Sequence, residues 1–90
     1  MDINSLKKGQ TSVKAKIRRQ LISILADTET IDKKELFSSL YSLSGLTSDQ
    51  LSDTSVDSVA VLYRSLIGAV IVDAMETGEV SSNGNSYFLN

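Results

Sequence analysis

One apolar stretch, residues 58–75, limits what this chain can fold into more than any other feature. Its apolar side chains recur at helical spacing on more than one face, which predicts a helix at about residues 55–76 that is buried on several sides. Three capping residues, Asp53, Thr54 and Ser55, mark its expected start. Because a chain of 90 residues has little material to cover such a helix, the helix is either the spine of the monomer or in part a contact with another subunit.

A predicted hairpin follows this helix directly. Gly78 ends the helix, and Asn83-Gly84 is the residue pair that most favours a type I′ turn between two short strands. A two-residue loop at that pair places Val80 opposite Tyr87. Alternation along the strands then puts both of these side chains on the core side, together with Leu89.

The long helix is apolar on more sides than a small core needs. Its extra apolar residues either belong to the core after all or form a surface for a partner. Phe88 is expected to point away from the core side of the hairpin, and Gly68 allows another helix to approach closely. The candidate interface residues, for a homodimer or for another protein, are Ile67, Gly68, Ile71 and Phe88.

The residues ahead of the long helix predict a series of shorter elements. Apolar residues at 3.6-residue spacing over residues 13–25 indicate an amphipathic helix, and residues 28–31 form a short link or a stub of strand. Asp32 caps a second helix that Gly45 ends, and Thr47 with Gln50 forms a capping box for a short third helix. We therefore expect a mostly α fold with a small C-terminal β-hairpin, in which residues 1–10 are a flexible basic arm and residues 11–90 are one domain.

Composition excludes several classes of function. The chain has no cysteine and no histidine, so it lacks thiolate chemistry and the commonest general base and metal ligand. It shows no glycine-rich phosphate loop and no cluster of metal ligands. We expect no enzyme, no cofactor and no small-molecule substrate. The N-terminus has no apolar signal-peptide core, and the run at residues 66–72 is too short to span a membrane, which predicts a cytoplasmic protein.

Charge is divided unevenly along the chain, although the net charge is only −2. Residues 1–19 carry a clear excess of positive charge, and the rest of the chain is acidic. A basic end can contact nucleic acid, and it can equally be a solvated tail and the wet face of a first helix. The basic residues concerned are Lys7, Lys8, Lys14, Lys16, Arg18 and Arg19.

The order of helix, short strand, helix, short helix, long helix and hairpin fits a winged-helix domain. More specifically, residues 30–90 resemble the N-terminal winged-helix module of Mrr-type restriction systems. The segments that carry the resemblance are Leu46-Thr-x-x-Gln-Leu51, Tyr63-Arg-Ser-Leu-Ile-Gly-Ala69, Met75-Glu-Thr-Gly-Glu-Val80 and Tyr87-Phe-Leu89. The resemblance implies DNA binding, with the long helix in a groove and the hairpin on the backbone. No nuclease domain is present in these residues, so no cleavage activity carries over.

Further candidate DNA contacts lie on the long helix and the hairpin. Ser55, Ser58 and Arg64 could reach bases or phosphates from the helix, or serve only as caps and ordinary surface. Asn83 and Asn85 could bind phosphate, although turn chemistry alone explains an Asn-Gly pair. The first hypothesis is a DNA-binding module, perhaps dimeric, that regulates transcription or a mobile element. The alternative is a protein-interaction or assembly module on the same fold.

Overall fold

The computed structural model describes residues 3–90 and is mostly helical, with a small antiparallel sheet. The strands lie in the order β1-β3-β2. This confirms the expected mostly α fold with a C-terminal hairpin, and it adds β1 as a third strand. In chain order the elements are α1 (Ile3–Lys8), α2 (Gln10–Ala26), β1 (Ile31–Asp32), α3 (Lys33–Ser42), α4 (Ser48–Ser52), α5 (Val59–Glu76), β2 (Val80–Asn83) and β3 (Ser86–Leu89).

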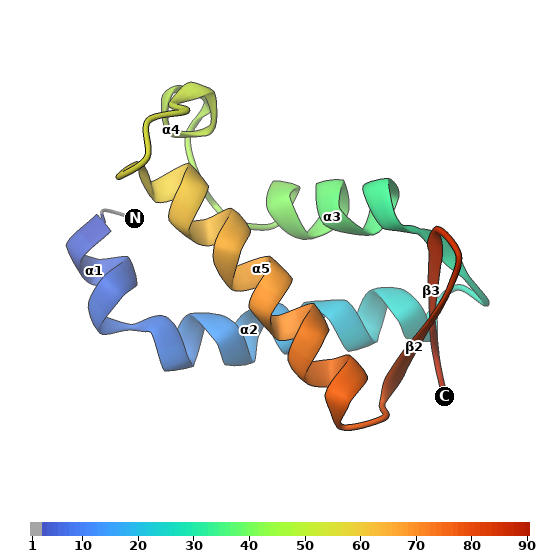
Figure 1. Cartoon of the computed structure of the whole chain (residues 1–90). Helices are drawn as coiled ribbons and strands as arrows, with labels where there is room; N and C mark the ends of the chain where they lie inside the picture. The colour runs from blue at the N-terminus through green and yellow to red at the C-terminus, as the bar shows by residue number, and fades with distance from the viewer. Residues whose placement is uncertain (1–2) are drawn as a thin grey trace.

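The long helix α5 is the spine of the molecule. It crosses α2 and leads into the hairpin, and α3 also packs against it (Figure 1). One side of α5 is fully buried, with Tyr63, Ile67 and Ala74 at 0% exposure. The side chains that cover it come mainly from α2 and α3 and include Ile17, Leu21, Leu25, Leu36 and Leu40. The monomer's own core therefore buries one side of this largely apolar helix.

The N-terminal segment differs from the expected flexible arm. Residues 1–2 lie outside the described residues, but the next residues form α1, and Leu6 is fully buried in the core. Gly9 joins α1 to α2, with its N–H donating to the Ser5 carbonyl and its own carbonyl accepting from Val13. Ile3 and Leu6 are too few apolar residues in a polar segment to give a periodic signal, so the sequence pattern does not predict this helix. The folded unit therefore includes residues that we expected to lie outside residues 11–90.

The start of α5 also differs from the expectation. The helix begins at Val59 with Ser58 as its cap, and Val56 lies outside it at 87% exposure. The Ser58 hydroxyl accepts from the Val61 N–H and donates to the Asp53 carbonyl. Ser55 instead donates to the Asp53 carboxylate in a separate turn. Ser58 serves as the cap because one hydrogen bond fixes its hydroxyl to the preceding turn and another fixes it to the first turn of α5.

The predicted starts of α3 and α4 are confirmed. Thr47 and Gln50 make both reciprocal bonds of a capping box at the start of α4. The Asp32 carboxylate accepts the Lys34 N–H at the start of α3. Gly45, beyond the end of α3, has the positive φ of 77° that glycine tolerates best.

The hairpin forms, but its turn is one residue later than the Asn-Gly pair predicts. Asn83 pairs with Ser86 and Val80 with Leu89, so the loop residues are Gly84 and Asn85. Gly84 has φ +64° while no described non-glycine residue has positive φ, a pattern that a type II′ turn permits and a type I′ turn does not. The third strand favours this register, because the Asn85 carbonyl accepts the Lys33 N–H where β1 meets α3.

This shift leaves the two faces of the hairpin as expected. Each residue of β2 pairs with the β3 residue two positions beyond its predicted partner. Because side chains alternate with a period of two, the same side chains still face the core. Val80 is therefore buried in the core, and Tyr87 and Leu89 pack against it. Phe88 pairs with Ser81 on the other face and is half-buried.

Candidate nucleic-acid interface

The side of α5 that faces solvent is the centre of the candidate site. Val61, Gly68 and Val72 fall on one line of the helix, because spacings of seven and eleven residues return close to the same angle. Val72 is 52% exposed, and Val61 and Gly68 are half-buried. Arg64 and Ser65 are exposed on either side of this line. We call these five residues the outer face of α5.

Basic residues of α1 and α2 border the outer face on one side. Lys7 lines a surface hollow together with Ser58, Val61 and Ser65. Farther along α5, Lys14 and Arg18 line a second hollow with Val70 and Asp73. Arg18 is already paired with Glu79 at 2.5 Å, so it supplies little free charge. Lys7 and Lys14 form no ion pair among the described residues, although Asp57 and Asp73 line the same two hollows.

Basic residues of α3 border the opposite flank. Lys33 and Lys34 line a largely apolar hollow with Phe37. The Lys33 ammonium lies 5.1 Å from the centre of the Tyr87 ring, on β3 of the hairpin. On α5 itself, the Arg64 guanidinium lies 5.3 Å from the ring centre of Tyr41, on α3. Such contacts hold a cation over a ring while leaving the rest of its surface in water.

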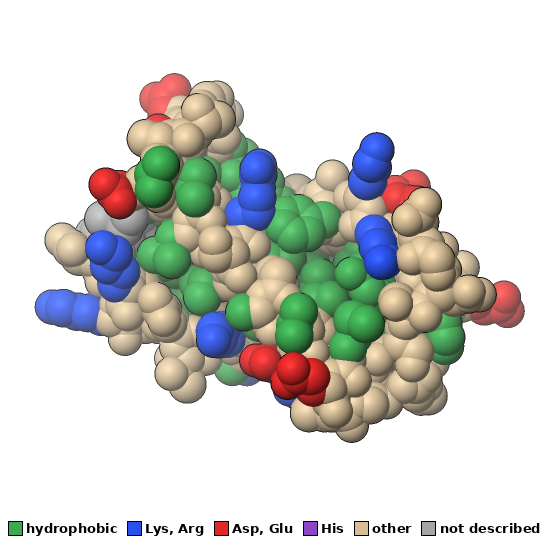
Figure 2. Space-filling model, in the orientation of Figure 1, with side chains coloured by type: hydrophobic (Ala, Val, Ile, Leu, Met, Phe, Trp, Pro, Cys, Tyr) green, Lys and Arg blue, Asp and Glu red, His purple; other side chains and the backbone are tan. Residues whose placement is uncertain are grey.

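Figure 2 displays this face of the molecule. Lys and Arg side chains lie on both sides of the apolar surface over α5 and α3, and acidic side chains gather mainly at the lower edge and the periphery. Acidic residues nevertheless lie beside both ends of the outer face, with Asp57 near its start and Asp73 and Glu76 near its end. Lys33 and Lys34 were not among the sequence-predicted contacts, because only the three-dimensional arrangement brings the start of α3 beside the hairpin.

Three of the predicted basic contacts, Lys8, Lys16 and Arg19, do not line these two hollows. Lys14 and Arg18 are on one flank of the buried Ile17 in α2, whereas Lys16 lies about 100° away on its other flank. Arg19 lies about 200° from Ile17 and is exposed. Lys8 is exposed on α1. The six N-terminal charges therefore do not act as a single patch.

The predicted polar contacts of the long helix are engaged in local structure. Ser58 is 6% exposed and is held as the α5 cap, so it is not a base contact. Ser55 donates to Asp53, and this hydrogen bond from the Ser55 hydroxyl holds the pKa of the Asp53 carboxyl below its usual range. Ser55 is exposed but lies in the turn before α5. The capping interpretation describes Ser58, and Ser55 belongs to the turn before the helix.

The tip of the hairpin is polar and uncharged. Asn83 pairs with Ser86 at the end of the strands, and Asn85 uses its carbonyl to accept from Lys33. Both asparagines are exposed. Their amides can contact phosphate, but they add no charge to such a contact.

Two of the predicted interface residues are internal. Ile67 is 0% exposed and Ile71 is 6% exposed, so both belong to the monomer's core and cannot form a surface contact. Gly68 remains on the surface, and a Cβ built there would meet nothing within 4 Å. No helix of the described chain approaches it closely. The exposed apolar residues nearest to it on α5 are Val72 and Met75.

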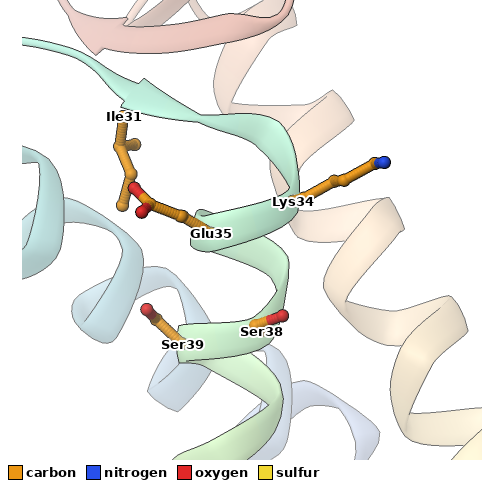
Figure 3. Close-up of a pocket in the computed structure, with 5 residues that line it drawn as sticks. All are labelled: Ile31, Lys34, Glu35, Ser38 and Ser39. Carbon is orange, nitrogen blue, oxygen red and sulfur yellow. The ribbon is translucent and has the colours of Figure 1, made fainter.

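A hollow on another side of α3 is lined by residues of β1 and α3. Ile31, Glu35 and Ser39 line one side of it, while Lys34 and Ser38 point to the other (Figure 3). The serine hydroxyls have no histidine to act as their base, since the chain contains none. Among residues 3–90, no group of three or more acidic side chains is placed to hold a metal ion.

Comparisons with known proteins add no relative: no protein-family model, curated protein or solved structure matches this chain. No helix in the described part of the chain is both long enough and apolar enough to cross a membrane.

Proposed function

We propose that this chain is a winged-helix module that binds duplex DNA with the outer face of α5. The order α2, β1, α3, α4, α5 and hairpin, with β1 beside β3, supports the winged-helix assignment. In that arrangement α5 is the helix that enters the groove, and the hairpin is the wing.

The observation that carries the proposal is the placement of cations on both flanks of α5. Lys7 and Lys14 lie on the α1–α2 flank, and Lys33 and Lys34 lie on the α3 flank. A helix seated in a major groove has a phosphate backbone on each side of it, so cations are needed on both flanks. Arg64 adds a fifth charge on the helix itself.

Acidic residues near the C-terminal end of α5 limit the strength of this binding. Asp73 and Glu76 are exposed there and repel phosphate. We expect a dissociation constant in the micromolar range at low salt, typical of non-specific contacts, and a steep loss of affinity as salt rises.

The test is fluorescence anisotropy of a labelled mixed-sequence duplex at several salt concentrations. The double variant Lys7→Ala/Lys14→Ala should weaken binding and lower the slope of log affinity against log salt by about 2, since each phosphate contact contributes about 1. The matched control is Lys16→Ala/Arg19→Ala, which removes the same charge from one half-buried and one exposed position off this face. Equal effects of the two variants, or no binding at low salt with tens of micromolar protein, would exclude the proposal.

A protein-interaction module is the second candidate. It is favoured by the exposed apolar side chains Leu43, Val56, Val72 and Met75, which are 38–87% exposed. Sedimentation velocity at increasing concentration tests the simplest form of it, a homodimer. Self-association that persists in high salt and is lost in Val72→Ser would support this candidate.

A further inference from the structure

The outer face of α5 has an unusual composition for a helix that enters a groove. Val61, Gly68 and Val72 form its central line and offer no side-chain donor or acceptor. The Ser65 hydroxyl donates to the Val61 carbonyl within the helix. Arg64 lies over the Tyr41 ring on the α3 side of this line. The centre of the face can therefore make apolar contacts but cannot pair with a polar base edge.

Gly68 has no internal role that accounts for it. Its backbone lies in an ordinary helix without positive φ, and a Cβ would meet nothing within 4 Å. Glycine costs about 1 kcal/mol relative to alanine inside a helix. Among the described residues nothing occupies the space beside Gly68, so this space is open to a molecule that binds the outer face.

Only one base carries an apolar group on its major-groove edge. Thymine presents a C5-methyl there beside its O4 acceptor, whereas guanine, cytosine and adenine carry no methyl group on this edge and are distinguished by their hydrogen-bonding atoms. Burying an unpaired polar base edge against valine is unfavourable, while burying a methyl group is favourable.

We propose, as a deepening of the proposed DNA-binding function, that α5 recognises thymine C5-methyl groups in the major groove. Val61 and Val72 contact the methyl groups, and Gly68 lets the rim of the groove come up to the helix backbone between them. The two valines are eleven residues apart, about 16 Å along the helix axis, so they reach different base pairs. The cations on both flanks of α5 hold the helix in place, which is the charge complementarity that selects DNA as the occupant of this face.

The experiment compares two duplexes that differ only in this methyl group. One is rich in A·T pairs, and the other has deoxyuridine at every thymidine position. Anisotropy titrations at one low salt concentration should show about threefold to fourfold weaker binding of the uracil duplex for each methyl group that is buried. A G·C-rich duplex with 5-methylcytosine should in turn bind more tightly than the unmethylated one.

The variant Val61→Ala/Val72→Ala should bind the thymine and uracil duplexes with similar affinity, while its salt slope stays that of the wild type. Val72 is half-exposed, so Val72→Ala alone, with circular dichroism as a check of folding, provides a second and milder variant.

Different results overturn different parts of the inference. Equal affinity of the wild type for the thymine and uracil duplexes would overturn methyl recognition but leave DNA binding intact. No binding to any duplex would overturn both. A salt-resistant dimer that dissociates in Val72→Ala would also overturn methyl recognition, because the face would then be covered by a second copy.

Discussion

The two sides of α5 are both apolar, yet only one of them is used by the fold. The inward side holds Tyr63, Ile67 and Ala74 at 0% exposure, whereas the outer face leaves Val72 about half in water. The outer face also carries Arg64 and Ser65, but its valines are of the same kind as the apolar residues of the inward side. What separates these apolar residues is which side the helices α2 and α3 cover. Hydrophobic residues on a helix therefore do not all contribute to stability, and those left uncovered are available for contact with another molecule.

The largest effect should come from shortening a side chain on the inward side. Ile67→Ala should lower the free energy of unfolding by about 2–5 kcal/mol, because it removes buried methyl groups and leaves a cavity in the core. Val72→Ala, on the outer face, should change it by no more than about 0.5 kcal/mol. Urea denaturation of both variants measures this difference. If the two variants lose similar stability, the outer face is covered by something in solution.

A charge change on the outer side should affect binding more than folding. Asp73→Asn/Glu76→Gln removes two exposed carboxylates beside the outer face and should strengthen binding to a mixed-sequence duplex several-fold at low salt. Glu29→Gln/Asp27→Asn, at the far end of α2, removes the same charge away from the face and is the control. Anisotropy at two salt concentrations separates the outcomes, and identical gains from both variants would indicate only a change in net charge.

Gly68→Ala should act in opposite directions on stability and on binding. Alanine is a better helix former, so the free energy of unfolding should rise by about 0.5–1 kcal/mol, since the added Cβ meets nothing. The same methyl group should obstruct the approach of the groove and weaken DNA binding. Thermal unfolding and anisotropy on one preparation test both signs. A loss of stability would mean that the surroundings of Gly68 are tighter than the structure shows.

The smallest effect concerns the hydroxyl of Tyr63 on the inward side. This group has no hydrogen-bond partner among the described residues, and burial raises the pKa of Tyr63 above its ordinary value. The folded state therefore holds the phenolic proton more tightly than the unfolded state. Its contribution to stability is complete below the unfolded pKa of about 10 and is lost as pH rises through the higher folded pKa. Tyr63→Phe should lose less stability than the wild type between neutral pH and about pH 11, as followed by urea denaturation, whereas an unchanged pH profile would place the hydroxyl in contact with water.

Local sequence signals predicted the elements well and their exact ends less well. Thr47 and Gln50 identify the start of α4 because both partners of the capping box lie within four residues. Before α5, however, several capping residues follow one another, and local pattern cannot choose among them. Ser58 is selected because its hydroxyl bonds both to the Asp53 carbonyl and to the Val61 N–H.

Other predictions failed because they depend on distant parts of the chain. The turn at Gly84-Asn85 reflects the pairing of the hairpin with β1, which lies more than fifty residues earlier. Ile67 and Ile71 could not be assigned to the core until the positions of α2 and α3 were known. For the same reason Lys33 joined the candidate site only through the fold, since nothing in its own segment relates it to Tyr87.

The burial of Leu6 has a consequence for how the N-terminal charges would meet an anionic partner. An unstructured arm sweeps a large volume and loses conformational entropy when it settles on its target. Because Leu6 fastens α1 to the core, Lys7 is already held next to the start of α5 before any encounter. This part of the binding surface is therefore preorganised. Its charges would contribute to the residence time of a complex without the entropic penalty that a mobile arm incurs.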